Sequence, residues 1–459
     1  MKGEGTVTST DALAVVDPVT YESGPPLAAL RRLRADGPVV WVDEPALHGL
    51  PAGPGFWLVL RHAEVERVLK EPATFSSWVG ATQVRDAADL AWVRRMMLNM
   101  DPPDHTRLRR PLTRSFTPRT VAALTAAIEA TAAGLVDRMI GGAAEGRCDF
   151  ARDVAADLPL ITLADVLGVP AEDRWLMYDW SNRVIGWQDP DYATSAAFDG
   201  AGATAMARAA MELRPVPGPD GRMPDPRTRA GMPDLYAYAR LLAEEKRRSP
   251  GQDVMSVLLA QVDEDGHGVS DAEFENMFWL FAVAGNETLR NGLPGGLIAL
   301  LQHPEQLAAV RADPALLPGA VEEMLRWWTP VMVFRRTAAA DVDLAGVRVR
   351  AGDKVVVSFT SANRDDAVFD EPDRFDVRRS PNPHLSFGHG PHFCLGAQLA
   401  RAQMRALFAE LLRRTSGIEL DGEPVLLRSN FQRGVKRLPL RWVAAGRAAP
   451  LSAGPRPPR

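Results

Sequence analysis

The sequence predicts a mainly helical protein with small β-sheets, folded as a single domain. Long stretches place apolar residues at helical spacing, whereas only a few short runs have the composition and alternation of strands. With 459 residues, 46% of them hydrophobic, the chain can fill a large core. We expect the domain to span residues 17–443, between a disordered tail over 1–16 and a flexible Pro/Ala/Gly-rich tail over 444–459.

The elements of the first half follow from periodicity and helix breakers. Gly37 and Pro38 stop the first amphipathic helix, and Pro159 kinks a later one. The expected elements are a helix over 26–34, paired strands over 39–42 and 56–60, and helices over 63–70, 120–141, 151–167 and 175–188.

In the second half, a capping box formed by Ser270 and Glu273 starts a long apolar helix that runs toward Gln302. The other expected elements are helices over 235–248, from about 316 and over 395–414, a strand after Pro330, and a hairpin of 342–349 with 353–359 around Gly352.

A polar break interrupts the long apolar helix at Asn286, Glu287 and Thr288, directly after Gly285. A buried carboxylate is costly unless it is partnered or functional. Thr288 can bond back to a carbonyl and open a local groove. The alternative is a solvated patch on an amphipathic helix.

Residues 387–396, Phe-Gly-His-Gly-Pro-His-Phe-Cys-Leu-Gly, form a glycine-rich loop that brings Cys394 to a helix start. Free N–H groups and the positive end of the helix dipole favour a thiolate there, which suits a soft metal or an iron porphyrin. Two alternatives are an inert buried cysteine and a zinc site made by Cys394 with nearby histidines. The histidines of that zinc site would be His384, His389 and His392.

The spacing of Phe387, Gly390, His392, Cys394 and Gly396 resembles the haem-binding loop of the cytochrome P450 superfamily, the haem-thiolate monooxygenases. The resemblance implies their triangular-prism fold and haem b (iron protoporphyrin IX). It also implies that Cys394 is the axial iron ligand, within a loop to which Phe387, His392 and Gly396 belong.

Two cationic side chains in the first quarter of the chain, His105 and Arg109, are four residues apart and share a helix face. Two cations on one face suit a dianionic group; taken alone they are also compatible with a solvated basic face. The resemblance implies that they bind a haem propionate, which Arg336 also contacts.

The resemblance assigns Ala284, Gly285, Glu287 and Thr288 to the oxygen-activating motif. It implies that Thr288 stabilises partly reduced oxygen and that Glu287 relays protons from solvent. It further implies a structural network of Glu323, Arg326 and Arg374. For the substrate pocket we expect an apolar lining from Leu280, Val283, Met332, Phe334 and Phe431.

The implied reaction inserts one oxygen atom from O2 into a hydrophobic small molecule, by hydroxylation or epoxidation, with sterol, terpenoid or lipid-like substrates favoured. Alternatives are a tailoring oxidase of polyketide, macrolide or aromatic metabolites, a peroxygenase and a non-catalytic haem-thiolate sensor or carrier. Electrons from NAD(P)H arrive through an external ferredoxin or flavodoxin and its reductase. The candidate docking patch contains Arg107, Arg110, Arg114, Arg401 and Arg405.

Composition excludes other classes. A net charge of −5 argues against nucleic-acid binding. No run reaches about 18 apolar residues, so we expect no membrane anchor and a cytoplasmic protein. The two cysteines, Cys148 and Cys394, are not expected to form a disulfide.

The Gly/Pro-rich segment 200–234 is interpreted either as the family's mobile lid or as a disordered surface insertion.

Overall fold

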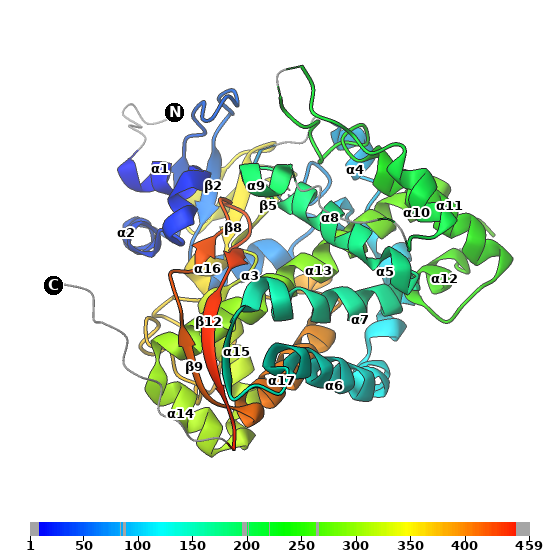
Figure 1. Ribbon diagram of the computed structural model, residues 1–459. Helices are drawn as coiled ribbons and strands as arrows, with labels where there is room; N and C mark the ends of the chain where they lie inside the picture. Colours follow the sequence, from blue (N-terminus) through cyan, green and yellow to red (C-terminus); the bar gives the residue numbers. More distant parts are fainter. Residues whose placement is uncertain are drawn as a thin grey trace.

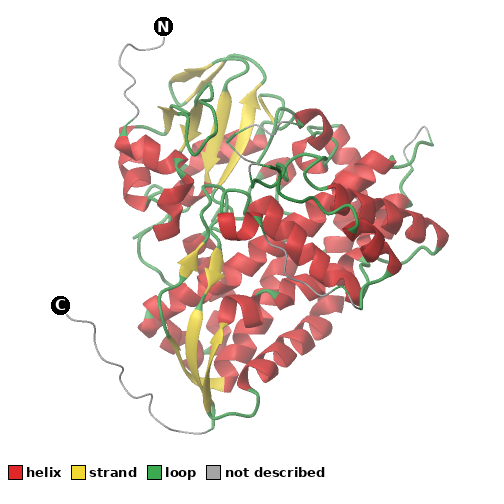
Figure 2. Ribbon diagram, turned by 45° about the horizontal axis from the view of Figure 1, so that its top comes forward, coloured by secondary structure: helices red, strands yellow, loops and turns green. Residues whose placement is uncertain are grey.

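The computed structural model describes residues 9–82, 84–85, 89–194, 200, 202–219, 221–262 and 266–446. Helices fill most of a roughly triangular outline, and the strands gather in small sheets along one side (Figure 2). The predicted fold class, mainly α with small β-sheets, is confirmed.

The longest helix, α13, crosses the centre of the molecule and organises the rest (Figure 1). Its capping box is formed as predicted: the Ser270 hydroxyl accepts from the Glu273 N–H, and the Glu273 carboxylate accepts from the Ser270 N–H at 2.9 Å. Helices α7, α8, α11 and α15 pack against it. The α-helices are α1 (Thr10–Val16), α2 (Leu27–Asp36), α3 (His62–Lys70), α4 (Leu90–Val93), α5 (Asp104–Thr113), α6 (Pro118–Ile140), α7 (Asp157–Leu167), α8 (Arg174–Ile185), α9 (Pro190–Ala193), α10 (Ala205–Met211), α11 (Pro233–Arg248), α12 (Val254–Leu259), α13 (Asp271–Gln302), α14 (Pro304–Ala312), α15 (Leu317–Trp328), α16 (Phe359–Ala362) and α17 (Ala397–Arg414).

The largest sheet has the strand order β1-β2-β8-β5-β3. The predicted antiparallel pair of β1 and β2 is confirmed. A second sheet, β4-β12-β9, lies at the far end of the molecule. The strands are β1 (Val39–Val42), β2 (Phe56–Val59), β3 (Phe75–Ser76), β4 (Glu145–Asp149), β5 (Val333–Ala338), β6 (Val342–Leu344), β7 (Val347–Val349), β8 (Lys354–Ser358), β9 (Thr415–Leu420), β10 (Val425–Leu426), β11 (Val435–Arg437) and β12 (Pro439–Ala444).

Two predictions about the chain path are wrong. Residues 342–349 form their own hairpin, because Ala345 and Gly346 both take positive φ (55° and 82°) and turn the chain there, whereas β8 pairs with β2 and β5. The N-terminal tail is not disordered through residue 16: α1 is capped by Ser9 and buries Val15 and Val16 against the core. Residues 1–8 and 447–459 lie outside the described part of the chain.

Within the described residues, one helix, α6, is long and apolar enough to cross a membrane by length and composition alone. One of its faces packs against α17 (Figure 1), where Ile128, Leu135 and Val136 enter the core. Helix–helix packing therefore accounts for the apolar residues on this one face, whereas most of the apolar window of α6 is not buried.

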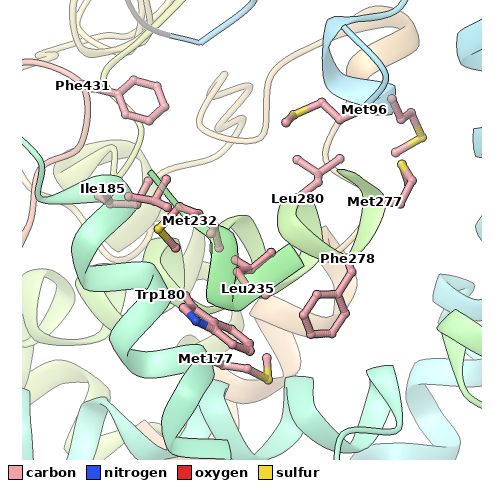
Figure 3. Packing of buried hydrophobic residues seen from close by; sticks show 14 of the residues in the cluster. Met96, Met177, Trp180, Ile185, Met232, Leu235, Met277, Phe278, Leu280 and Phe431 are labelled. Carbon is pink, nitrogen blue, oxygen red and sulfur yellow. The ribbon is translucent and has the colours of Figure 1, made fainter. Parts of the chain in front are cut away.

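The Gly/Pro-rich segment 200–234 contains α10, which packs on α11. Arg214 bonds Asp179 of α8 at 2.6 Å, and Arg229 bonds Glu275 of α13 at 2.6 Å. The described part of this segment is therefore fixed to the helical core. An apolar cluster lies beneath it, in which Trp180, Met232 and Leu235 pack together (Figure 3).

Candidate active site

One cavity lies between α13 and the loop that carries Cys394, and both contribute to its wall. Cys394, His392 and Gly396 line one side, while Ala284 and Thr288 line the other. Sequence stretches more than a hundred residues apart thus meet across one chamber, as the two predicted motifs require.

The polar break of α13 divides its side chains between the chamber and the protein interior. Ala284 and Gly285 are exposed, although the helix around them is mostly buried, because they face the cavity. The Thr288 hydroxyl donates to the Ala284 carbonyl at 2.9 Å, the back-bond expected from the sequence. The open wall of α13 therefore carries a single hydroxyl at its polar break.

Glu287 points away from the chamber. It is fully buried and accepts from Arg290 at 2.6 Å and from Asn291 at 3.1 Å. Although burial opposes the Arg290 charge, the Glu287 carboxylate raises the pKa of Arg290 above its usual value. The guanidinium of Arg290 lies over Tyr178 and Tyr192, at 4.7 and 5.3 Å. The structure thus brings Thr288, but not Glu287, to the cavity.

The cysteine loop is held by backbone contacts that few residue types permit. Gly390 has φ 67°, and a Cβ there would lie 2.3 Å from the Leu69 carbonyl oxygen. The Cys394 N–H donates to the Phe387 carbonyl at 2.9 Å, and Arg401 stacks on the Phe387 ring at 4.5 Å. These contacts fix Cys394 just before α17, whose first helical residue is Ala397 rather than Leu395.

Burial raises the pKa of the Cys394 thiol, against the opposing effects of the Gly396 N–H and the Arg109 and Arg401 charges. The sequence-based argument from the helix terminus alone therefore underestimates the cost of burying a thiolate. A cation that binds the sulfur directly would supply the missing compensation.

Four cationic or potentially cationic side chains, His105, Arg109, Arg336 and His392, converge beside the cysteine loop. The rings of His105 and His392 lie 4.2 Å apart. Among the described residues, neither ring nitrogen of His105 has a hydrogen-bond partner, and Arg336 Nη2 has none. Burial, followed by the nearby Arg109 charge, lowers the pKa of His105 to about 4; burial also lowers the pKa of Arg336 to about 10. Such buried, unpaired donors fit a dianionic ligand.

Glu323 and Arg326 form the predicted buried ion pair, bonded at 2.7 Å through two parallel hydrogen bonds. Arg326 also donates to the Asn363 carbonyl at 2.8 Å, and the Asn363 side chain accepts from the Leu385 N–H at 2.7 Å. The pair thereby anchors the chain just ahead of the cysteine loop.

The prediction that Arg374 joins this network through its side chain is wrong. Its guanidinium pairs with Glu371 at the surface at 2.7 Å, and only its carbonyl accepts from Arg326. Arg379 takes the predicted place and contacts Glu323 at 3.2 Å. The turn after Phe375 reverses the chain and directs Arg379, not Arg374, inward. A second arginine soon after this turn was the available signal.

Of the predicted pocket residues, Leu280, Val283, Phe334 and Phe431 line the cavity. Met332 does not: it is buried, and its backbone pairs with the Phe431 carbonyl and the Phe359 N–H, each at 2.9 Å. We call the part of the structure formed by the described residues of 80–99 and 222–232, together with Arg335 of β5, the roof of the cavity. Sequence reasoning missed lining residues of this roof, including Met96, Met97 and Arg227, because their segments lack a regular period.

A cytochrome P450 family model matches residues 238–435. The steroid C26-monooxygenase of Mycolicibacterium smegmatis is 36% identical over 432 residues, covering 92% of each chain. The methyl-branched lipid omega-hydroxylase of Mycobacterium tuberculosis is 37% identical over 416 residues, covering 90% of each. A Mycobacterium marinum cytochrome P450 solved in complex with pseudoionone is 36% identical with a TM-score of 0.80, covering 95% of this chain and 100% of that one.

The chain belongs to the cytochrome P450 family. As a P450 it is a monooxygenase that carries haem b, uses O2 and receives NAD(P)H electrons through redox partners to oxidise a hydrophobic substrate. The similarity to hydroxylating relatives favours this function over the tailoring-oxidase and peroxygenase alternatives.

The residues of this P450 fit haem better than zinc. The unpaired donors of His105 and Arg336 suit the propionates, whereas His384 and His389 contact glutamates, at 3.1 and 3.4 Å. No group of three or more His, Cys, Asp or Glu within the described ranges is arranged to hold a metal ion. The zinc alternative therefore has no ligand set in this part of the chain.

Proposed function

We propose that this P450 binds haem iron through Cys394 Sγ and hydroxylates a sterol-like or branched lipid in the chamber between α13 and the cysteine loop. The observation that carries the proposal is that Cys394 and Thr288 line the same cavity. Haem b, when bound, activates O2 and transfers one oxygen atom to the substrate. His105, Arg109, Arg336 and His392 would hold its propionates, because the two guanidiniums supply positive charge and the unpaired nitrogens of His105 and Arg336 can donate hydrogen bonds to an anion.

Thr288 holds a proton at Oγ1 on the chamber side of α13, and its bond to the Ala284 carbonyl orients that hydroxyl. We expect Thr288 to deliver this proton into the chamber after its hydroxyl rotates away from the Ala284 carbonyl. Gly285 lets Leu163 of α7 pack closely against α13, since a Cβ there would lie 2.9 Å from the Leu163 side chain. For Glu287 to relay protons from solvent, its carboxylate has to leave Arg290 and turn toward Thr288.

Aliphatic and aromatic side chains of the chamber support an extended apolar substrate, and the relatives include a steroid monooxygenase and a methyl-branched lipid hydroxylase. An optical titration of the ferric holoprotein with sterols, terpenoids, branched fatty acids, macrolides and small aromatics tests this. We expect a low- to high-spin Soret shift with sterols or branched lipids. A shift only with macrolides or aromatics would contradict the proposed substrate class.

We further propose a cytoplasmic location and a ferredoxin or flavodoxin as electron donor, docking beside the cysteine loop. Arg110, Arg114 and Arg405 are exposed there. Arg107 pairs with Glu273 and Arg401 with Glu322, so these two contribute less free charge. Arg110→Glu with Arg405→Glu should slow reduction by an acidic partner and change its salt dependence. Unchanged reduction rates would move the docking site elsewhere.

A further inference from the structure

The charged side chains in the described lining of the chamber are all positive. Its lining among the described residues contains four arginines and no aspartate or glutamate: Arg85, Arg109, Arg227 and Arg335. Arg109 belongs to the cation cluster beside the cysteine loop. The other three come from the roof, and the proposed apolar substrate gives them no role.

Arg335 positions the roof. Its guanidinium donates to the carbonyls of Val79 at 2.8 Å and Val84 at 3.1 Å, and its N–H donates to the Ala81 carbonyl at 2.9 Å. The side chain is almost completely buried. Arg335 therefore fixes the segment that ends at Arg85.

Arg85 places a positive charge at the chamber wall. It donates to the carbonyls of Pro45, at 2.6 Å, and Pro51. Carbonyl groups orient a guanidinium but do not cancel its charge. The loop that carries these prolines also meets the segment before Arg227, because the Arg222 guanidinium packs against Gly49. Segments carrying Arg85 and Arg227 are thus joined through one loop.

Arg227 is held rigidly with its guanidinium 4.0 Å from the Trp187 ring centroid. Asp225 pairs with the same guanidinium at 2.8 and 2.9 Å, so Arg227 brings a preoriented hydrogen-bond donor to the wall, while the uncompensated positive charge there comes from Arg85. The side chain of Arg227 is 13% exposed, so it contacts little solvent. A planar, preoriented guanidinium at the wall of an apolar chamber is suited to bind a carboxylate.

We propose that the substrate is an apolar acid whose carboxylate lies at Arg85 and Arg227. Its apolar body would extend along Phe334 and Leu280 toward Thr288, so that a carbon remote from the carboxylate is oxidised. This inference rests on the proposed function and adds an anionic end to the lipid-like substrate. Opposite charge in a water-poor chamber would provide both affinity and a fixed orientation.

The test compares hexadecanoic acid with its methyl ester, which have the same chain and differ in charge. Binding to the haem-loaded protein is measured by calorimetry at low and high salt. We expect the acid to bind about tenfold more tightly at low salt, as one charge-assisted contact implies, and high salt to reduce the difference. The double variant Arg85→Gln, Arg227→Gln should bind acid and ester equally and keep the wild-type affinity for the ester. Arg240→Gln, a matched change at an exposed pair on α11 away from the cavity wall, should keep the preference.

Equal binding of acid and ester by the wild type would overturn the inference, whether or not the double variant folds. If the ester is then still bound and hydroxylated, the proposed lipid hydroxylase remains. If neither compound binds or is oxidised, the proposed substrate class is wrong as well. Loss of acid and ester affinity in equal measure in the double variant would assign the two arginines to packing and would also overturn the inference.

Discussion

The two sides of the chamber are built differently. The cysteine side is fixed by a buried ion pair within one helix turn, Glu323 with Arg326, which reaches the loop through Asn363. The roof is assembled from segments far apart in the chain. There Arg229 binds Glu275 and lies 4.0 Å over Trp92 and 5.2 Å from Tyr236. The side that would hold the iron thus depends on a fully buried ion pair, whereas the contact that joins 222–232 to Trp92 and α13 on the other side depends on a partly exposed arginine.

This difference predicts where stability is concentrated. Breaking a fully buried ion pair leaves an uncompensated charge in the core, whereas partly exposed pairs are screened by water. We therefore expect substitutions on the cysteine side to lower the haem content of the protein. Substitutions on the roof should instead make local unfolding of the roof segments more frequent.

The largest effect is expected for Arg326→Ala. Removing this guanidinium leaves Glu323 buried without its main partner and should cost about 3–5 kcal/mol. The protein should accumulate without haem, as measured by the ratio of Soret to protein absorbance. Arg374→Ala is the control, because its side chain is 57% exposed and forms a surface pair with Glu371. Normal haem content in Arg326→Ala would contradict the account of the cysteine side.

A smaller, pH-dependent effect is expected for Glu322→Gln. Burial opposes the Glu322 charge, but His384 and Arg401 lower the pKa of Glu322 from 4.5 to about 2. A carboxylate whose pKa is lower when folded stabilises the protein above pH 4.5, and that contribution is lost as the pH falls toward 2. At neutral pH the free energy of unfolding of the wild type should exceed that of Glu322→Gln by on the order of 2 kcal/mol.

Thermal unfolding followed across acidic and neutral pH measures the Glu322 contribution. The gap between wild type and Glu322→Gln should close as the pH falls below 4.5. Glu371→Gln, at an exposed pair with Arg374, is the matched control and should change the unfolding temperature little. A Glu322→Gln gap that stays constant with pH would show that the side chain acts through packing alone.

The smallest effect on stability is expected for Arg229→Ala. Its side chain is 44% exposed, so its contacts with Glu275 and Trp92 should contribute on the order of 1 kcal/mol. Hydrogen exchange should nevertheless accelerate around Trp92 and in 222–232, because the clasp between them is lost. Arg240→Ala, at an exposed pair on α11, is the control. Unchanged exchange in Arg229→Ala would mean that other contacts hold the roof.

The same contrast explains how far sequence reasoning reached. Cys394, Thr288, Glu323 and Arg326 lie in motifs with local spacing, so their placement on the chamber or in its frame was predictable. The orientation of Glu287 toward Arg290 depends on Tyr178 and Tyr192 from other helices, which no local pattern shows.

The path of the turns and the positions of the roof side chains were harder to predict, because they also depend on contacts between distant parts of the chain. Replacement of Arg374 by Arg379 in the network depends on how one turn reverses the chain, and Arg85 and Arg227 face the chamber only because distant loops meet. Such contacts carry no periodic signal in the sequence.

The central claim is that Thr288 delivers protons into the cavity that Cys394 lines on the opposite side. It is tested most directly by the share of reducing equivalents recovered in product and in peroxide for wild type, Thr288→Ser and Thr288→Ala. We expect Thr288→Ser to resemble wild type, and Thr288→Ala to keep haem and substrate binding while its product yield falls about tenfold and peroxide rises. An unchanged yield in Thr288→Ala would contradict the account.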